Sequence, residues 1–167
     1  MRTCLKNNDR SWCYKLGSAD IERLHPIYRF ATDFGKLMGF HFAFSEDSGS
    51  FETVIAIDYD GRYQRAEPEK NFESYGYSWH VFVPDILDYE NKIIIEFEEE
   101  SKPQKGPKIR KKGHWEESKR DTRRDQFYKL AGFSVFKVWQ NQHKKNTWKI
   151  PLVQFLIECH ENQENKL

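Results

Sequence analysis

Apolar residues recur with a helical period in the first part of the chain. The pattern runs from Ser18, which is suited to N-cap a helix, to about Met38, and Gly39 follows as a helix end. Pro26 lies inside the pattern, so we expect the helix to kink there or to restart. Two further helices are expected, one from Trp115 to Ala131 closed by Gly132, and one from Pro151 to about Cys159.

Alternating or continuous apolar stretches between these helices predict strands. They cover 40–44, 53–59, 77–83, the run that begins with Ile93, and 133–139. Asp60-Gly61 and the polar segment Asp88–Lys92 predict two hairpin turns, the polar stretch 67–75 a loop, and the tail 161–167 disorder. The order of helix, antiparallel strands, helix, strand and helix is typical of an α/β fold, here one domain of 167 residues.

Three carboxylates are placed around the second predicted hairpin. Its first strand ends in Pro84-Asp85, and its second leads from an isoleucine run into Glu96 and Glu98, which point to the same side of a strand. Acids that end buried, paired strands repel one another unless a cation lies between them. Oxygen ligands at this density suit Mg²⁺ or Mn²⁺. The alternative is a solvent-exposed acidic hairpin.

A basic segment follows the acids. The net charge is only +1, so it is the distribution of charge that is informative. Prolines and glycines make the first half of the segment a loop. A basic loop beside a metal site is suited to binding the phosphate backbone of DNA, although a solvated linker is the alternative. The candidate contact residues are Lys102, Lys105, Lys108, Arg110, Lys111, Lys112 and Arg124.

The order of several short motifs between residues 79 and 140 resembles a known family. The motifs are Pro84-Asp85, the strand Ile93–Glu98, His114, the segment 121–125 and the strand 130–139. Together they resemble the PD-(D/E)xK nuclease superfamily, and within it the branch of very-short-patch repair endonucleases. The resemblance implies a restriction-endonuclease-like mixed β-sheet flanked by helices and a Mg²⁺-dependent endonuclease that hydrolyses DNA. Asp85 and Glu96 would hold the metal, with Glu98 as a further ligand.

The chain departs from the pattern of that family at Glu98. The superfamily usually has a lysine there, and this branch has an aspartate, so the group that activates water is left open. His114 and Lys119 are the two candidates, and His114 can instead cap the following helix. Arg124 can belong to the site or form a helix-surface ion pair with Asp121. Glu22 can reach the metal from the first helix or simply favour the helix dipole, and Trp139 is expected in the core.

Composition restricts the remaining possibilities. No apolar run is long enough to span a membrane, and the first residues lack the apolar core of a secretion signal. Three unpatterned cysteines indicate a reducing compartment, so we expect a cytoplasmic protein without a disulfide framework. A zinc site made by Cys4, Cys13, Cys159 and His160 is the less favoured alternative. A nucleic-acid-binding protein that has lost catalysis and an RNA-directed nuclease stay open as alternative functions.

Overall fold

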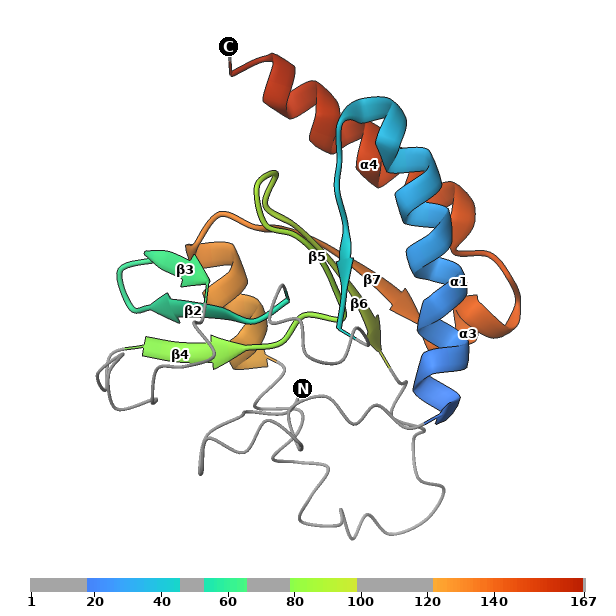
Figure 1. Ribbon diagram of the computed structural model, residues 1–167, viewed down its shortest axis with the longest axis horizontal. Coiled ribbons are helices and arrows are strands. Elements are labelled where there is room, and N and C mark those ends of the chain that lie inside the picture. Colours follow the sequence, from blue (N-terminus) through green and yellow to red (C-terminus); the bar gives the residue numbers. More distant parts are fainter. Residues whose placement is uncertain (1–17, 46–52, 66–78, 99–121, 167) are drawn as a thin grey trace, which may run out of the picture.

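The computed structural model describes residues 18–45, 53–65, 79–98 and 122–166, and within them two sheets and several helices (Figure 1). The helices are α1 (Ser18–Gly35), the short 3-10 helix η2 (Lys36–Met38), a helix over residues 122–130, α3 (Gln140–Lys144) and α4 (Lys149–Glu164). The strands are β1 (Ala43–Phe44), β2 (Ile55–Asp58), β3 (Tyr63–Arg65), β4 (Trp79–Phe82), β5 (Ile86–Asp88), β6 (Ile93–Glu98) and β7 (Ser134–Trp139).

The larger sheet is mixed and has the strand order β1-β5-β6-β7. β1, β5 and β6 are antiparallel to their neighbours, whereas β7 is parallel to β6. Parallel neighbours need a crossover connection, and the 122–130 helix lies in it. The smaller sheet, in the order β3-β2-β4, is antiparallel throughout. The expected α/β class, with sheets flanked by helices, is therefore confirmed.

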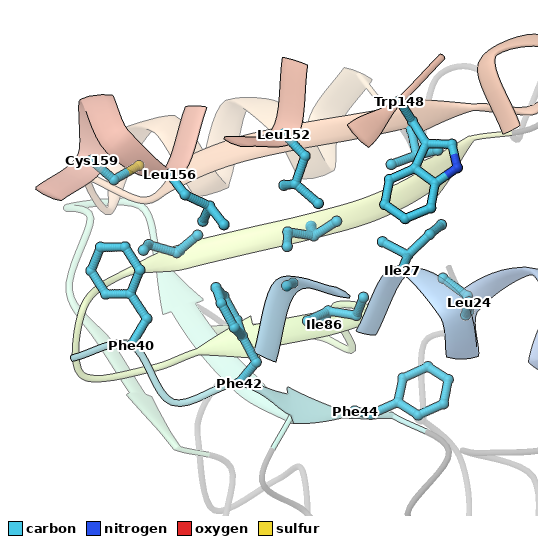
Figure 2. Packing of buried hydrophobic residues seen from close by; sticks show 14 residues of the cluster. Leu24, Ile27, Phe40, Phe42, Phe44, Ile86, Trp148, Leu152, Leu156 and Cys159 are labelled. Atoms are coloured by element: carbon cyan, nitrogen blue, oxygen red, sulfur yellow. The ribbon is translucent and has the colours of Figure 1, made fainter. Parts of the chain in front are cut away.

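The two faces of the larger sheet are covered by different elements. On one face α1 and α4 pack on Ile93 and Ile95 of β6 and on Ile86 of β5 (Figure 2). On the other face Ile94 of β6 packs with Tyr128 of the 122–130 helix and with side chains of the smaller sheet. Because successive side chains of a strand point to opposite faces, the isoleucine run of β6 supplies both cores.

Several local expectations are confirmed. Gly39 ends η2 with a left-handed φ of 77°, as expected for a helix end. The expected restart at Pro26 does not occur, because α1 runs through that proline as one helix. Asp58–Tyr63 forms the expected hairpin between β2 and β3, with Gly61 at φ 79°. A Cβ at Gly61 would lie 2.5 Å from the carbonyl oxygen of Leu130, so glycine is required by conformation and by contact. The hairpin thereby packs directly against the 122–130 helix.

Several features differ from the expectations. The first strand of the acidic hairpin is interrupted at Pro84, which lacks the N–H that a continuous ladder needs, so Asp85 lies just before β5 rather than at the end of β4. The short helix α3 was not expected, and Trp139 before it is 40 % exposed rather than in the core. α4 starts two residues before Pro151 and continues to Glu164, so residues 161–164 of the tail are helical.

Two contacts hold the last turns of α4, one with the β5–β6 turn and one within the helix. The Gln163 side chain donates to the backbone carbonyl of Asn91 at 3.2 Å, and His160 lies 3.2 Å from Glu164 one turn later. None of the helices in the described ranges is both long and apolar enough to cross a membrane.

Candidate active site

Asp85 and Glu96 face each other across two antiparallel strands. Ile86 pairs with Ile95 in the β5–β6 ladder, so Asp85, one residue earlier, stands opposite Glu96, one residue later. The backbone N–H of Phe97 donates to Oδ2 of Asp85 at 2.8 Å, and this hydrogen bond holds the carboxyl group just before the start of β5. The two carboxyl groups are close enough to share a side-chain hydrogen bond. The hairpin thus brings together the two acids that the resemblance singles out.

The surroundings of this acid pair disfavour its full ionisation. Burial raises the pKa of Asp85, against the opposing effects of the Phe97 N–H, Glu96 and Arg124. Burial and then the charge of Asp85 raise the pKa of Glu96 well above its usual range. Glu96 is only 4 % exposed, so water cannot screen the repulsion. Without a cation between them, the pair is most stable when it retains a proton.

The 122–130 helix supplies a donor and a cation to the glutamates. The hydroxyl of Tyr128 donates to Oε1 of Glu96 at 3.1 Å. Burial, followed by the charge of Glu96, raises the pKa of Tyr128 well above its usual range, so this hydroxyl stays protonated. Arg124 donates to Glu98, and its Nη1 lies 3.9 Å from Oε2 of Glu96. Both glutamates therefore lie on the helix-facing side of β6, as their spacing predicts.

Arg124 is a buried member of this cluster, with only 3 % of its side chain exposed. Burial alone would lower its pKa, but Glu96, Tyr128 and Glu98 outweigh that effect and raise it. The guanidinium also contacts Asp125 at 3.2 Å. Arg124 is thus not a helix-surface residue, and its expected contact with nucleic acid stays a prediction.

Lys137 is a site residue that the sequence did not reveal. It lies on β7 beside Glu96 in the parallel β6–β7 register. Its Nζ lies 2.5 Å from Oδ2 of Asp125 and 3.8 Å from Oε1 of Glu98. The available signal was a lysine inside the otherwise apolar strand 133–139, but only the strand pairing shows that it faces the acids. Lys137 therefore lies beside Glu98 in space, although the two are about forty positions apart in the sequence.

Among the residues that the structure describes, the charges of the cluster do not cancel. Its four carboxylates belong to Asp85, Glu96, Glu98 and Asp125, and its two cations to Arg124 and Lys137. Two negative charges are left over when all six groups are ionised. One divalent cation, or two protons, would balance them.

The structure groups some of the predicted site residues and leaves others undescribed. Asp85 and Glu96 adjoin, and Glu98 is turned toward Arg124, so no group of three acidic, histidine or cysteine ligands is arranged around one point within the described ranges. Cys159 is buried and unpaired on the opposite face of the sheet. The side chains of the remaining candidates are outside the part of the chain that the structure describes. They are Cys4, Cys13, Glu22, Lys102, Lys105, Lys108, Arg110, Lys111, Lys112, His114, Lys119 and Asp121.

Comparison of the chain with protein-family models, with curated proteins and with solved structures finds no match.

Proposed function

We propose that this protein is a metal-dependent endonuclease that hydrolyses DNA phosphodiester bonds. The observation that carries the proposal is the Asp85–Glu96 pair, two enclosed carboxyl groups held together across β5 and β6 with an excess of negative charge. Two carboxyl groups that retain a proton because they repel each other also favour a divalent cation, because the cation removes the same repulsion. The charge excess of the whole cluster matches one such ion.

The donor set fits Mg²⁺ or Mn²⁺. Asp85 and Glu96 offer hard oxygen ligands from a rigid pair of strands, and the Phe97 N–H orients one of them. Glu98 would join them only after releasing Arg124. When bound, the ion would polarise the scissile phosphate and lower the pKa of an attacking water.

Lys137 fits the role of a positioning cation at the reacting phosphate. Its ammonium group is held by Asp125 and Glu98 at the edge of the acid pair, and 26 % of its side chain remains exposed. From there it can donate a hydrogen bond to the attacking water or to a phosphate oxygen, where negative charge develops. In the hydrolysis the water oxygen bonds to phosphorus, the bond to the leaving sugar oxygen breaks, and the water proton passes to a base. His114 and Lys119 remain the candidates for that base.

The finer fold assignment belongs to the same proposal. A mixed sheet with acids on a central hairpin, a crossover helix and flanking helices agrees with the restriction-endonuclease-like core that the motifs resemble. The basic segment 101–124 follows β6 directly, so its lysines and arginines would bind the DNA backbone beside the acids.

One observation favours a second candidate, a nucleic-acid-binding protein without catalysis. Arg124 engages both Glu96 and Glu98, and so it partly satisfies the acids without any metal. In that case the cluster would be structural, and nucleic acid would bind without being cut.

The test incubates the protein with supercoiled plasmid, linear duplex, mismatched duplex and single-stranded RNA, in Mg²⁺, Mn²⁺ or EDTA. We expect cleavage of DNA with either metal and none in EDTA. Asp85→Asn and Glu96→Gln should each abolish cleavage while retaining the fold, because each removes a ligand and also a repulsive charge. Cleavage of RNA alone would redirect the proposal to an RNA-directed nuclease.

The matched control is Asp60→Asn, which removes an exposed carboxylate from the β2–β3 turn. It should cleave like the wild type, and a contaminating nuclease would appear equally in all preparations. DNA binding without cleavage by the wild type in either metal would favour the second candidate. Cleavage by the Asp85 or Glu96 variant at the wild-type rate would show that these acids do not hold the metal.

A further inference from the structure

A cavity of about 460 Å³ opens between α1 and the connection from α3 to α4. Phe30 and the buried Trp148 pack edge to face at 5.4 Å in its wall. The side chains that carry its chemistry are His25, Arg29 and Asp33 of α1, His143 of α3 and Lys149 of α4. Its size is within the range of about 300–1,000 Å³ that is typical of small-molecule sites.

The charges around this cavity favour an anion. Arg29 and Lys149 contribute cationic side chains and His25 and His143 contribute imidazole N–H donors. None of the four forms an ion pair with any residue that the structure describes. Asp33 is the acid that opposes them. Residues 25, 29 and 33 are spaced by one helical turn, so they share one side of α1.

The start of α4 is a second, independent reason to expect an anion in the cavity. Lys149 is the first residue of this 16-residue helix, and the first turn contains no acidic residue. The N-terminal end of a helix carries partial positive charge, so a lysine there is electrostatically unfavourable and an acid is the usual choice. An anion in the cavity would relieve this repulsion.

The position of the cavity connects it to the acidic cluster. The ring of His143 packs edge to face on Phe97 at 5.7 Å, and Phe97 lies between Glu96 and Glu98 and donates its N–H to Asp85. Phe97 faces α1 and α4, whereas the two glutamates face the 122–130 helix. The cavity and the acids are therefore on opposite faces of the larger sheet, near the end where β6 and β7 stop. Figure 1 shows α3 beside that end of β7.

From these observations we propose that the cavity binds a phosphate group of the nucleic-acid substrate, on the far side of the sheet edge from the acids. This inference rests on the proposed function, because it takes nucleic acid as the ligand. A strand that passes over the ends of β6 and β7 would present one phosphate to the acidic cluster and a neighbouring part of its backbone to Arg29 and Lys149. Such an interaction would position the strand and carry no sequence information.

The direct test measures binding of four small probes by NMR, through the indole N–H of Trp148 and the ring of His143. The probes are thymidine, thymidine 5′-monophosphate, the dinucleotide with one internal phosphodiester, and inorganic phosphate. The three phosphate-bearing probes should shift these resonances and thymidine should not. Binding of the dinucleotide indicates an internal backbone phosphate, and binding of the monoesters alone indicates a strand end. Equal shifts with thymidine would overturn the inference.

Variants locate the binding. Arg29→Gln with Lys149→Gln should weaken binding by about tenfold for each cation removed, and Asp33→Asn should strengthen it. The matched control, Lys129→Gln with Lys166→Gln, removes an exposed cation from the 122–130 helix and another just after α4, and it should leave probe binding unchanged. If the first double variant bound the probes like the wild type, the cavity would not be the phosphate site.

A salt titration of DNA binding in EDTA separates this inference from the proposed function. Removing the cation that binds one phosphate should flatten the plot of log affinity against log salt by about 0.9 for duplex DNA. If the protein bound the probes in the cavity but never cleaved DNA, only the endonuclease proposal would fail. If it cleaved DNA while the double variant kept the wild-type salt slope and probe affinity, only the cavity inference would fail.

Discussion

The two faces of β6 contrast strongly. Ile93 and Ile95 belong to the hydrophobic cluster formed with α1 and α4, and Phe97 packs against it. Figure 2 shows Leu152, Leu156 and Trp148 in that cluster. Glu96 and Glu98 point the other way, where Ile94 is their apolar neighbour on the strand and Arg124 their buried partner. One strand of six residues thus builds a hydrophobic core on one side and a charged cluster on the other.

The two faces of β6 contribute differently to the stability of the fold. Apolar burial stabilises a fold by about 25 cal/mol for each Å² removed from water, so the α1–α4 face needs no further explanation. Buried ion pairs contribute little net stability, because the cost of desolvation offsets the attraction. Glu96, Glu98 and Arg124 are therefore poor choices for stability alone. Their presence opposite a hydrophobic core supports the proposal that the charged cluster has a chemical role.

The largest expected effect is a loss of cleavage rate when Lys137 on the charged face is changed. Lys137→Met keeps much of the side-chain length but removes the cation beside the acids. Loss of a preorganised donor should lower the cleavage rate by about 10²–10³-fold. The free energy of unfolding should change by less than about 1 kcal/mol, since the pair with Asp125 is partly exposed. Rates under single-turnover conditions and urea unfolding measure the two quantities.

The control for this change is Lys129→Met, which removes an exposed lysine from the 122–130 helix. It should leave both rate and stability near the wild-type values. An unaltered cleavage rate in Lys137→Met would show that the ion pairs of Lys137 are structural and that water activation lies elsewhere.

The elements of the apolar face were largely predictable from the sequence, whereas the charged face was not. Helical spacing ending at Gly39 predicted α1, and the isoleucine run predicted β6, because period and turn chemistry are local properties. Asp85 and Glu96 were found because they flank one hairpin. Lys137 and the buried state of Arg124 depend on the parallel pairing of β7 with β6, which joins residues about forty positions apart and has no local signature. The cavity between α1 and α4 depends on helix packing in the same way.

A change on the apolar face should lower the stability and leave the cleavage rate unchanged. Leu152 of α4 is fully buried in the cluster beneath α1. Leu152→Ala should lower the free energy of unfolding by about 2–5 kcal/mol, through reduced apolar burial and a residual cavity. Cleavage per folded molecule should stay unchanged, because no charged group is moved. Urea unfolding and rates normalised to the folded fraction measure both.

The matched control is Ile150→Ala, two residues away on the same helix, where the side chain is 73 % exposed. Its effect on unfolding should be less than about 0.5 kcal/mol. If Leu152→Ala reduced the cleavage rate of the folded protein as strongly as Lys137→Met, the two faces would not be functionally separate.

The smallest expected effect is a pH dependence of stability that arises from the charged face. The groups around Glu96 are Asp85, Glu98, Arg124 and Tyr128, and burial followed by Asp85 raises the pKa of Glu96 well above its usual range. The folded state therefore binds this proton more tightly than the unfolded chain does. The resulting stability is complete below the unfolded pKa of about 4.3 and is lost as pH rises toward the raised folded value.

In EDTA, the free energy of unfolding should thus fall by at most about 1.4 kcal/mol per pH unit for this proton as pH rises above about 4.3. Glu96→Gln cannot ionise, so it should lack this fall and should be more stable than the wild type at pH 8. Glu161→Gln, which alters an exposed acid on α4, should keep the wild-type profile. Adding Mg²⁺ should restore stability at high pH to the wild type but not to Glu96→Gln, because a divalent cation favours the ionised pair. Parallel profiles for wild type and Glu96→Gln in urea titrations from pH 4 to 8 would mean that the acid pair is ionised in the free protein and that Arg124 and Lys137 balance it.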